Sequence, residues 1–181
     1  MSSDKTHDYT FKIMMLGDAS VGKTSLTIRY ISGNFLEDLK LTIGVDFYSK
    51  IIKFMEKSVK LQIWDFGGEK RFRFLLSQYC KGANGAFFLY DTTNKQSLEH
   101  LSDWTQIVRE HAGNIPIILV GSKSDLKEFK VVEEEEGIRS TRKYNLAGFI
   151  ELSSKTGENV AEAFNQMTTI LFQNFAPEVF K

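Results

Sequence analysis

The feature that constrains this chain most is the segment GDASVGKT, Gly17–Thr24, which directly follows the apolar run Phe11–Leu16. It fits the pattern G-x-x-x-x-G-K-[ST], and an amphipathic segment follows it. Glycines let such a loop curl so that several backbone N–H groups hold phosphates, and the helix N-terminus adds partial positive charge. A chance glycine turn is the alternative, which the position after a buried strand disfavours. We therefore predict a phosphate-binding loop, with Lys23 on the terminal phosphates and the Thr24 hydroxyl on Mg²⁺.

Short apolar runs alternate with amphipathic segments along the remaining chain, which indicates an α/β sheet with crossover helices. Nearly unbroken apolar runs are typical of parallel strands covered on both faces. The segment Val59–Trp64 instead alternates apolar and polar residues, and it follows Gly44–Phe54 across the polar turn MEKS, so a β-hairpin is predicted. We expect a three-layer α/β/α sandwich with a mostly parallel six-stranded sheet and one antiparallel edge hairpin. The parallel strand candidates are Phe11–Leu16, Gly85–Tyr90, Ile115–Val120 and Ala147–Leu152.

Two helices are predicted from apolar spacing, and a third from charge. The run Glu133–Glu136 is typical of a solvated first helical turn, where carboxylates favour the macrodipole, and we assign it no function. The predicted apolar stripes are Leu98, Leu101, Thr105 and Val108 on one helix, and Val160, Phe164, Met167 and Leu171 on the last helix.

Composition limits the partners and the compartment. The 181 residues suit one domain, and 23 basic residues balance 23 acidic ones, so we expect no nucleic-acid partner. Cys80 is the single cysteine. The polar first ten residues and the lack of a long apolar run lead us to expect neither a signal peptide nor a membrane-spanning segment. We expect a cytoplasmic protein that reaches a membrane only through a missing C-terminus or a partner, because the last residues offer no cysteine for prenylation. Residues 1–9 and 176–181 are expected to be tails of a domain spanning 10–175.

Three further motifs follow predicted strands and indicate which nucleotide is bound. Asp65 ends the alternating strand, where an aspartate holds Mg²⁺ through water, and Gly68 can offer its N–H to a γ-phosphate. The segment Ser122–Asp125 (SKSD) lies where strand ends line a crevice. Asp125 can accept from N1–H and the exocyclic amine of guanine, a donor pair that adenine lacks. The backbone amides of Ser153–Lys155 (SSK) can meet guanine O6. Each motif alone is weak evidence for a guanine-nucleotide site. The three motifs in this order after a phosphate-binding loop are strong evidence together.

In this order the motifs resemble those of small GTPases of the Ras superfamily, which are P-loop NTPases, and the Rab branch most closely. The resemblance extends from Phe11 to about Phe172. It implies that Phe47, Trp64 and Tyr79 form an aromatic triad that contacts effectors, although ordinary sheet packing is the alternative. The Rab-like stretches are TIGVDF (Thr42–Phe47), WD (Trp64–Asp65) with RFR (Arg71–Arg73), and SSKTGENV (Ser153–Val160).

The resemblance implies a cycle between GTP and GDP states with Mg²⁺, in which switch I (about Leu36–Asp46) and switch II (about Gly67–Tyr79) are presented to effectors. An exchange factor and a GTPase-activating protein would be further partners. By similarity the catalytic residues are Glu69, Lys23, Thr42 and Gly68, and the metal ligands are Thr24, Thr42 and, through water, Asp65. The implied nucleotide contacts are Asp18, Ala19, Ser20, Val21, Gly22, Lys23, Thr24, Ser25, Phe35, Thr42, Gly68, Ser122, Lys123, Asp125, Leu126, Ser153, Ser154 and Lys155.

Three departures from the family pattern affect binding and the switches. Ser122 replaces the usual asparagine of the base-reading motif. Its hydroxyl can still bond locally, so we expect guanine preference to survive with some loss of affinity. Gly67 gives the Gly-Gly pair of the Arf and Gα branches in place of Ala-Gly, which loosens switch II. Leu39 stands where many relatives have a tyrosine that closes over the phosphates.

The fourth departure is Glu69, which stands where the family has a glutamine that orients the attacking water. A carboxylate keeps the acceptor, loses the donor and places negative charge beside the γ-phosphate. The carboxylate can act as a base or water anchor, so that hydrolysis persists by a different route, or it can imitate the amide when it is protonated. Repulsion by the phosphate can also push the side chain out of the site. The alternative to all three is a glutamate that points to solvent. We expect a slow GTPase in which Glu69 takes part. The alternatives are a nucleotide-holding scaffold with little hydrolysis, and a P-loop ATPase or nucleotide kinase, against which Asp125 argues.

Overall fold

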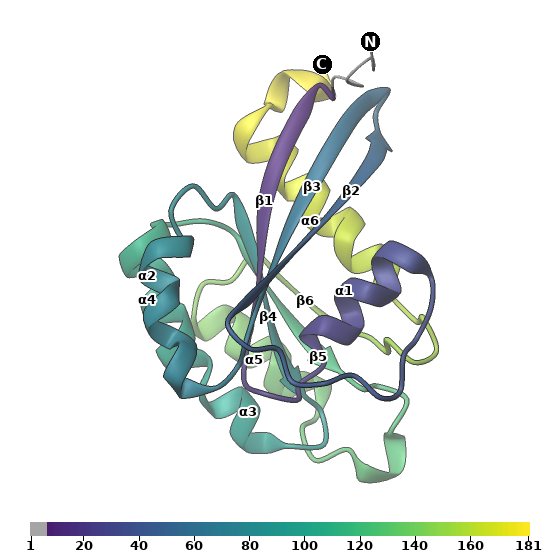
Figure 1. Cartoon of the computed structure of the whole chain (residues 1–181), viewed down its shortest axis with the longest axis vertical. Coiled ribbons are helices and arrows are strands. Elements are labelled where there is room, and N and C mark those ends of the chain that lie inside the picture. Colours follow the sequence, from purple (N-terminus) through teal and green to yellow (C-terminus); the bar gives the residue numbers. More distant parts are fainter. Residues whose placement is uncertain (1–6) are drawn as a thin grey trace.

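The computed structural model describes residues 7–181, apart from the side chains of Lys70, Phe72 and Arg73. A six-stranded sheet in the order β2-β3-β1-β4-β5-β6 crosses the molecule (Figure 1). Only β2 is antiparallel to its neighbour, so the predicted mostly parallel sheet with an antiparallel edge hairpin is confirmed. The strands are β1 (Tyr9–Leu16), β2 (Val45–Phe54), β3 (Lys57–Phe66), β4 (Gly85–Asp91), β5 (Ile117–Ser122) and β6 (Gly148–Glu151).

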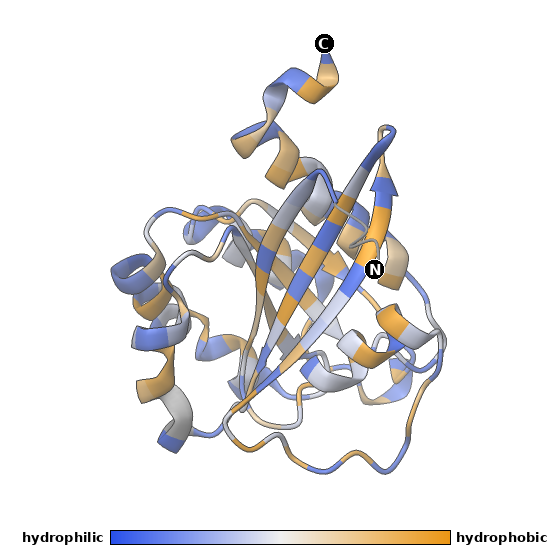
Figure 2. Ribbon diagram, turned by 45° about the horizontal axis from the view of Figure 1, so that its top comes forward, coloured by the Kyte–Doolittle hydropathy of each residue, from blue (hydrophilic) through white to orange (hydrophobic). Residues whose placement is uncertain are grey.

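Strand ends differ from the predicted ones for local reasons. β5 begins at Ile117 and not at Ile115, because Pro116 has no N–H to donate to a neighbouring strand. The hairpin turns at Met55 and Glu56, whose φ angles of 45° and 63° are both left-handed, as a two-residue hairpin turn requires. The alternation of apolar and polar residues along β3 is visible in Figure 2.

Helices cover both faces of the sheet, which confirms the three layers. Successive residues of β1 point to opposite faces of the sheet. Ile13 lies in the core that α1 (Lys23–Ser32) and α6 (Val160–Phe175) cover, and Met14 lies in the core on the opposite face. The helices on the second face are α2 (Leu76–Tyr79), α3 (Lys95–Glu99), α4 (Leu101–Ala112) and α5 (Glu134–Lys143), and the 3₁₀ turns are η1 (Lys70–Leu75), η2 (Lys127–Phe129) and η3 (Pro177–Phe180).

The helical predictions hold with one difference. The stripe on the last helix is buried, and three of the four glutamates form the first turn of α5 after Glu133 at its N-cap. The segment predicted as a single helix around residues 98–108 is two helices, α3 and α4, which meet at His100. All four residues of its stripe are nevertheless buried against the sheet. Among residues 7–181, no helix combines the length and apolar character needed to cross a bilayer.

Both ends of the chain pack more closely than the sequence suggested. β1 begins at Tyr9, and residues 1–6 of the expected N-terminal tail lie outside the described residues. The segment 176–181, which we expected to be a tail, contains η3, and its Phe180 ring lies 6.3 Å from that of Phe54. The Tyr9 hydroxyl donates to Glu178 at 3.3 Å. Phe54 of β2 stacks on Phe172 of α6, and the segment 176–181 packs on this pair of rings through Phe180.

Candidate functional site

The loop Gly17–Gly22 lies between β1 and α1, so the N-terminus of α1 opens onto it. Gly17 has a φ angle of 132°, and a Cβ there would lie 2.3 Å from the Leu89 carbonyl oxygen. Gly22 has a φ angle of 97°. Both positions therefore need glycine, as the motif predicts. Ser20 is also left-handed, with a φ angle of 65°, although it carries a side chain.

Lys23 lies under this loop and is buried. Its Nζ donates to the carbonyl oxygens of Gly17 and Asp18, at 2.9 and 2.7 Å. Burial lowers the pKa of Lys23 to about 8, and the carboxylates of Asp65 and Asp18 oppose that shift. Two of the three ammonium donors thus hold the loop, which leaves the third to point at an anion.

Two hydroxyls and a carboxylate meet beside Lys23, although they come from three separate segments. Thr24 Oγ1 donates to Asp65 Oδ2 at 2.5 Å and lies 2.8 Å from Thr42 Oγ1. Asp65 is fully buried, and burial raises its pKa to about 6. Its Oδ1 has no hydrogen-bond partner within the described part of the chain. A divalent cation would give this orphaned oxygen the charge that it lacks. Hydroxyl and carboxylate oxygens are the hard ligands that Mg²⁺ prefers, so the donor set fits Mg²⁺.

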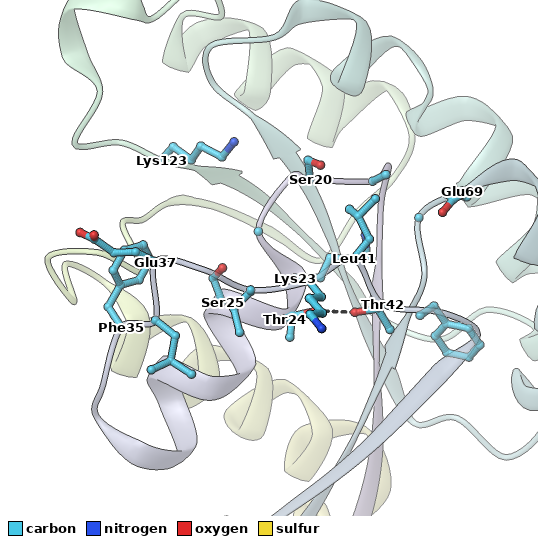
Figure 3. Close-up of a pocket in the computed structure, with 17 residues that line it drawn as sticks. Ser20, Lys23, Thr24, Ser25, Phe35, Glu37, Leu41, Thr42, Glu69 and Lys123 are labelled. Atoms are coloured by element: carbon cyan, nitrogen blue, oxygen red, sulfur yellow. Dashed lines mark hydrogen bonds between the residues drawn. The ribbon is translucent and has the colours of Figure 1, made fainter.

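A continuous depression extends from these groups to the ends of β5 and β6. Its phosphate-side cavity of about 250 Å³ and its base-side cavity of about 330 Å³ are both lined by Phe35 and Lys123. Figure 3 shows Phe35 at one side of the phosphate-side cavity and Glu69 at the other, with Lys23 between them. The predicted residues that line one cavity or both are Ala19, Ser20, Gly22, Lys23, Thr24, Ser25, Phe35, Thr42, Gly68, Glu69, Ser122, Lys123, Asp125, Leu126, Ser154 and Lys155.

The base-side carboxylate is held in place by a buried hydroxyl. Ser153 Oγ donates to Asp125 Oδ1 at 2.6 Å and accepts from the Thr156 N–H at 3.1 Å. Ser153 is fully buried, so its side chain orients Asp125 from behind, while Ser154 and Lys155 line the cavity.

Ser122 stands at the end of β5 and is buried. Its hydroxyl lies 2.6 Å from the Val21 carbonyl oxygen and 2.9 Å from that of Tyr90, so its single proton is shared between the P-loop and β4. The local bonding expected of a hydroxyl at this position is therefore present. Ser122 ties the loop to the sheet in this structure.

We expect Ser122→Ala to lower the free energy of unfolding by about 1–2 kcal/mol, because two buried carbonyl groups lose their hydroxyl partner. Urea unfolding of the nucleotide-free protein measures this change. Ser124→Ala is the matched control, since the Ser124 hydroxyl makes a long, exposed contact of 3.4 Å with Glu158. Equal effects of the two substitutions would contradict the tethering role.

Our sequence analysis did not identify Asp91, which positions the base-side residue Lys123. Lys123 is left-handed, with a φ angle of 62°, and its Nζ contacts Asp91 Oδ2 at 2.6 Å. The other carboxylate oxygen of Asp91 accepts from Thr93 at 2.7 Å. Asp91 ends an apolar parallel strand, as Asp65 ends β3, so the rule that identified Asp65 also identifies Asp91.

The beginning of switch II lies against the P-loop. A Cβ on Gly68 would lie 2.1–2.4 Å from backbone atoms of Asp18 and Ala19, so only glycine fits there. Glu69 follows, and its carboxylate accepts from Arg71 Nε at 2.8 Å and from Arg71 Nη2 at 3.2 Å. Arg71 therefore binds the Glu69 carboxylate and balances its negative charge.

The three predicted effector residues contact one another on the β2–β3 side of the molecule. The ring centroids of Phe47 and Trp64 lie 4.6 Å apart, and those of Trp64 and Tyr79 lie 5.5 Å apart. Phe47 is 57% exposed, so ordinary sheet packing does not cover its ring. The triad is thus an apolar surface open to a partner.

Comparison with known proteins gives one consistent answer. A family model described as the Ras family matches residues 12–173. Ras-related protein RABA4b of Arabidopsis thaliana is 40% identical over 166 residues, which cover 91% of this chain and 74% of the relative. GTP-binding protein ypt3 of Schizosaccharomyces pombe is 40% identical over 174 residues, covering 96% and 81%. Ras-related protein Rab-1 of Theileria parva is 40% identical over 169 residues, covering 92% and 76%.

Proposed function

Because the chain belongs to the Ras family of small GTPases and is Rab-like within it, we propose that it cycles as a molecular switch that hydrolyses GTP slowly and presents its switch regions to effectors. One observation carries the proposal: Lys23, Thr24, Thr42 and Asp65 converge at one end of a depression that reaches Asp125 at its other end.

The phosphate end supports recognition of a nucleoside triphosphate. The loop amides and Lys23 would hold the phosphates, and Gly68, packed against the Asp18–Ala19 peptide, would offer its N–H to the γ-phosphate. Thr24, Thr42 and, through water, Asp65 would hold Mg²⁺, which neutralises phosphate charge when bound. Thr42 and Gly68 belong to switch I and switch II, so release of the γ-phosphate would free both segments.

The other end supports guanine over adenine. The Ser153 hydroxyl leaves the second oxygen of the Asp125 carboxylate to accept from the base, and the ionised group can take both guanine donors. The ring of Phe35 and the stem of Lys123 line the same cavity, where they would pack on the base. Ser122 is already bonded to the P-loop, which supports the expected loss of affinity relative to an asparagine.

Glu69 would take part in hydrolysis while Arg71 compensates its charge. The Arg71–Glu69 pair gives the carboxylate a fixed partner at the edge of the phosphate-side cavity. The pair is exposed, so it is worth at most about 1 kcal/mol and can open during turnover. The same pair also favours the alternative function, a nucleotide-holding scaffold, if Arg71 keeps Glu69 away from water.

Ras-family proteins work with effectors, exchange factors and activating proteins, and we propose the same classes of partner here. The triad of Phe47, Trp64 and Tyr79 adjoins both switch regions and would be the effector surface. An activating protein that supplies an arginine fits the switch I sequence DLKLT, Asp38–Thr42, which contains no arginine.

Displacement of a fluorescent GDP analogue tests nucleotide choice directly. Unlabelled GDP and GTP should displace the analogue at concentrations at least about 100-fold below those of ADP and ATP, because adenine cannot satisfy Asp125. Chelation of Mg²⁺ should accelerate its release. Equal displacement by ADP would rule out a guanine-nucleotide switch.

A further inference from the structure

A hydrogen-bonded triad joins the P-loop to the junction between α3 and α4. His100 Nδ1 lies 2.6 Å from Asp18 Oδ2, and Trp104 Nε1 donates to Asp18 Oδ1 at 3.2 Å. His100 occupies the break between the two helices, 82 residues from Asp18 in sequence. Both oxygens of this carboxylate therefore have a partner on the same side of the loop.

The chemistry of the pair fixes the direction of its hydrogen bond. An ionised carboxylate only accepts, so His100 Nδ1 carries the proton and donates it. The side chains of His100 and Asp18 are 25% and 23% exposed, and Trp104 is buried. A hydrogen bond to a charged group in such a partly shielded position is stronger than one between neutral groups in water.

Asp18 also makes contacts on the inner side of the loop. Its carbonyl oxygen accepts from Lys23 Nζ at 2.7 Å, and its peptide with Ala19 is the surface against which Gly68 packs. Ala19 and Ser20, the next two residues, line the phosphate-side cavity. One residue thus connects α4 through its side chain with Lys23 and switch II through its backbone.

We propose that His100 is a positioning residue for the nucleotide: through Asp18 it holds the P-loop in the shape in which Lys23 and the loop amides receive phosphates. The inference rests on the proposed function, since it deepens the account of the same site. His100 itself does no chemistry and touches no substrate. A loop held in its binding shape before the ligand arrives loses less conformational freedom on binding, which raises the affinity for the nucleotide. Among variants of one site, such differences in affinity appear mostly in the dissociation rate.

Two substitutions of His100 separate the hydrogen bond from the packing of the ring. Asparagine places its Nδ2 at the same number of bonds from Cβ as histidine Nδ1, so His100→Asn keeps a donor toward Asp18. His100→Leu keeps a side chain of similar bulk and removes the donor. His111→Leu is the matched control, because His111 is an exposed histidine in the last turn of the same helix, α4.

The dissociation rate of a fluorescent GDP analogue, measured with Mg²⁺ and excess unlabelled GDP, is the readout. We expect His100→Leu to raise this rate at least about ten-fold, as the loss of one hydrogen bond to a charged group implies, and His100→Asn to stay within about two-fold of the wild type. His111→Leu should have no effect. In an Asp18→Ala background, His100→Leu should have no further effect, since the two residues act as one unit.

Three results would each overturn the proposal: a wild-type rate for His100→Leu, an equally fast rate for His100→Asn, or an undiminished effect of His100→Leu in the Asp18→Ala background. Failure of the wild type to bind the GDP analogue would instead refute the proposed function. The two failures are therefore distinguishable within one set of measurements.

Discussion

Lys23→Met is expected to lower the affinity for GDP and GTP at least about 100-fold, because each hydrogen bond from a charged donor to a phosphate contributes about 1.5–3 kcal/mol. Methionine keeps much of the length of the side chain and lacks the ammonium. The Gly17 and Asp18 carbonyl oxygens also lose the donor that holds the loop in shape. Titration of the fluorescent GDP analogue at constant Mg²⁺ measures the loss.

The matched control for this change is Lys53→Met, an exposed lysine on β2 outside the depression. Its affinity for GDP should equal that of the wild type. A loss of less than about three-fold for Lys23→Met would show that the ammonium does not contact the phosphates. Urea unfolding of both variants separates binding from folding.

The pKa of Lys23 predicts how the affinity for GDP depends on pH. Its pKa in the free protein is lowered to about 8, chiefly by burial, and phosphates favour the charged ammonium, so binding raises that pKa. Affinity should therefore be constant between about pH 7, where Asp65 is ionised, and pH 8, and it should fall by up to about ten-fold per unit above pH 8, until the pKa of the complex is reached. Lys23→Met should lose this decline, which assigns the titration to Lys23.

Asp125→Asn is expected to reverse the choice of base. Loss of the ionised acceptor should weaken GDP binding at least about 100-fold, since two hydrogen bonds to a charged group are affected. Xanthine has a carbonyl oxygen where guanine has its amine, and the asparagine amide can donate to it. The variant should therefore bind xanthosine diphosphate more tightly than GDP, in the same displacement assay.

The asparagine oxygen can still accept from Ser153, so the loop should keep its shape. Glu128→Gln removes one negative charge at an exposed position three residues further on, and it should leave both affinities unchanged. A variant Asp125→Asn that still prefers GDP would place base recognition elsewhere in the depression.

Motifs predicted those parts of the site that depend on short segments. The P-loop, Asp65 and Asp125 lie at strand ends, and the succession of short apolar runs and amphipathic segments predicted a parallel sheet in which such ends meet at one edge. Ser122 was expected to bond locally, and its contacts with the Val21 and Tyr90 carbonyl groups agree with that expectation.

Contacts between distant segments were not predictable from the sequence in the same way. The Asp18–His100 hydrogen bond joins residues of a loop and a helix junction, and periodicity alone extended one helix through His100. The Arg71–Glu69 pair is local, but it depends on the 3₁₀ conformation that begins at Lys70, which no motif encodes. The packing of 176–181 likewise depends on aromatic partners from β2 and α6.

Single-turnover release of phosphate from the GTP complex, for the wild type and Glu69→Gln across pH, tests most directly whether the protein is a GTP-hydrolysing switch. We predict slow release by the wild type at a rate that changes with pH, and a rate for Glu69→Gln that does not. Equal rates would show that Glu69 takes no part. Intact GTP bound to the wild type throughout, with release only from Glu69→Gln, would contradict the enzymatic switch and support the scaffold.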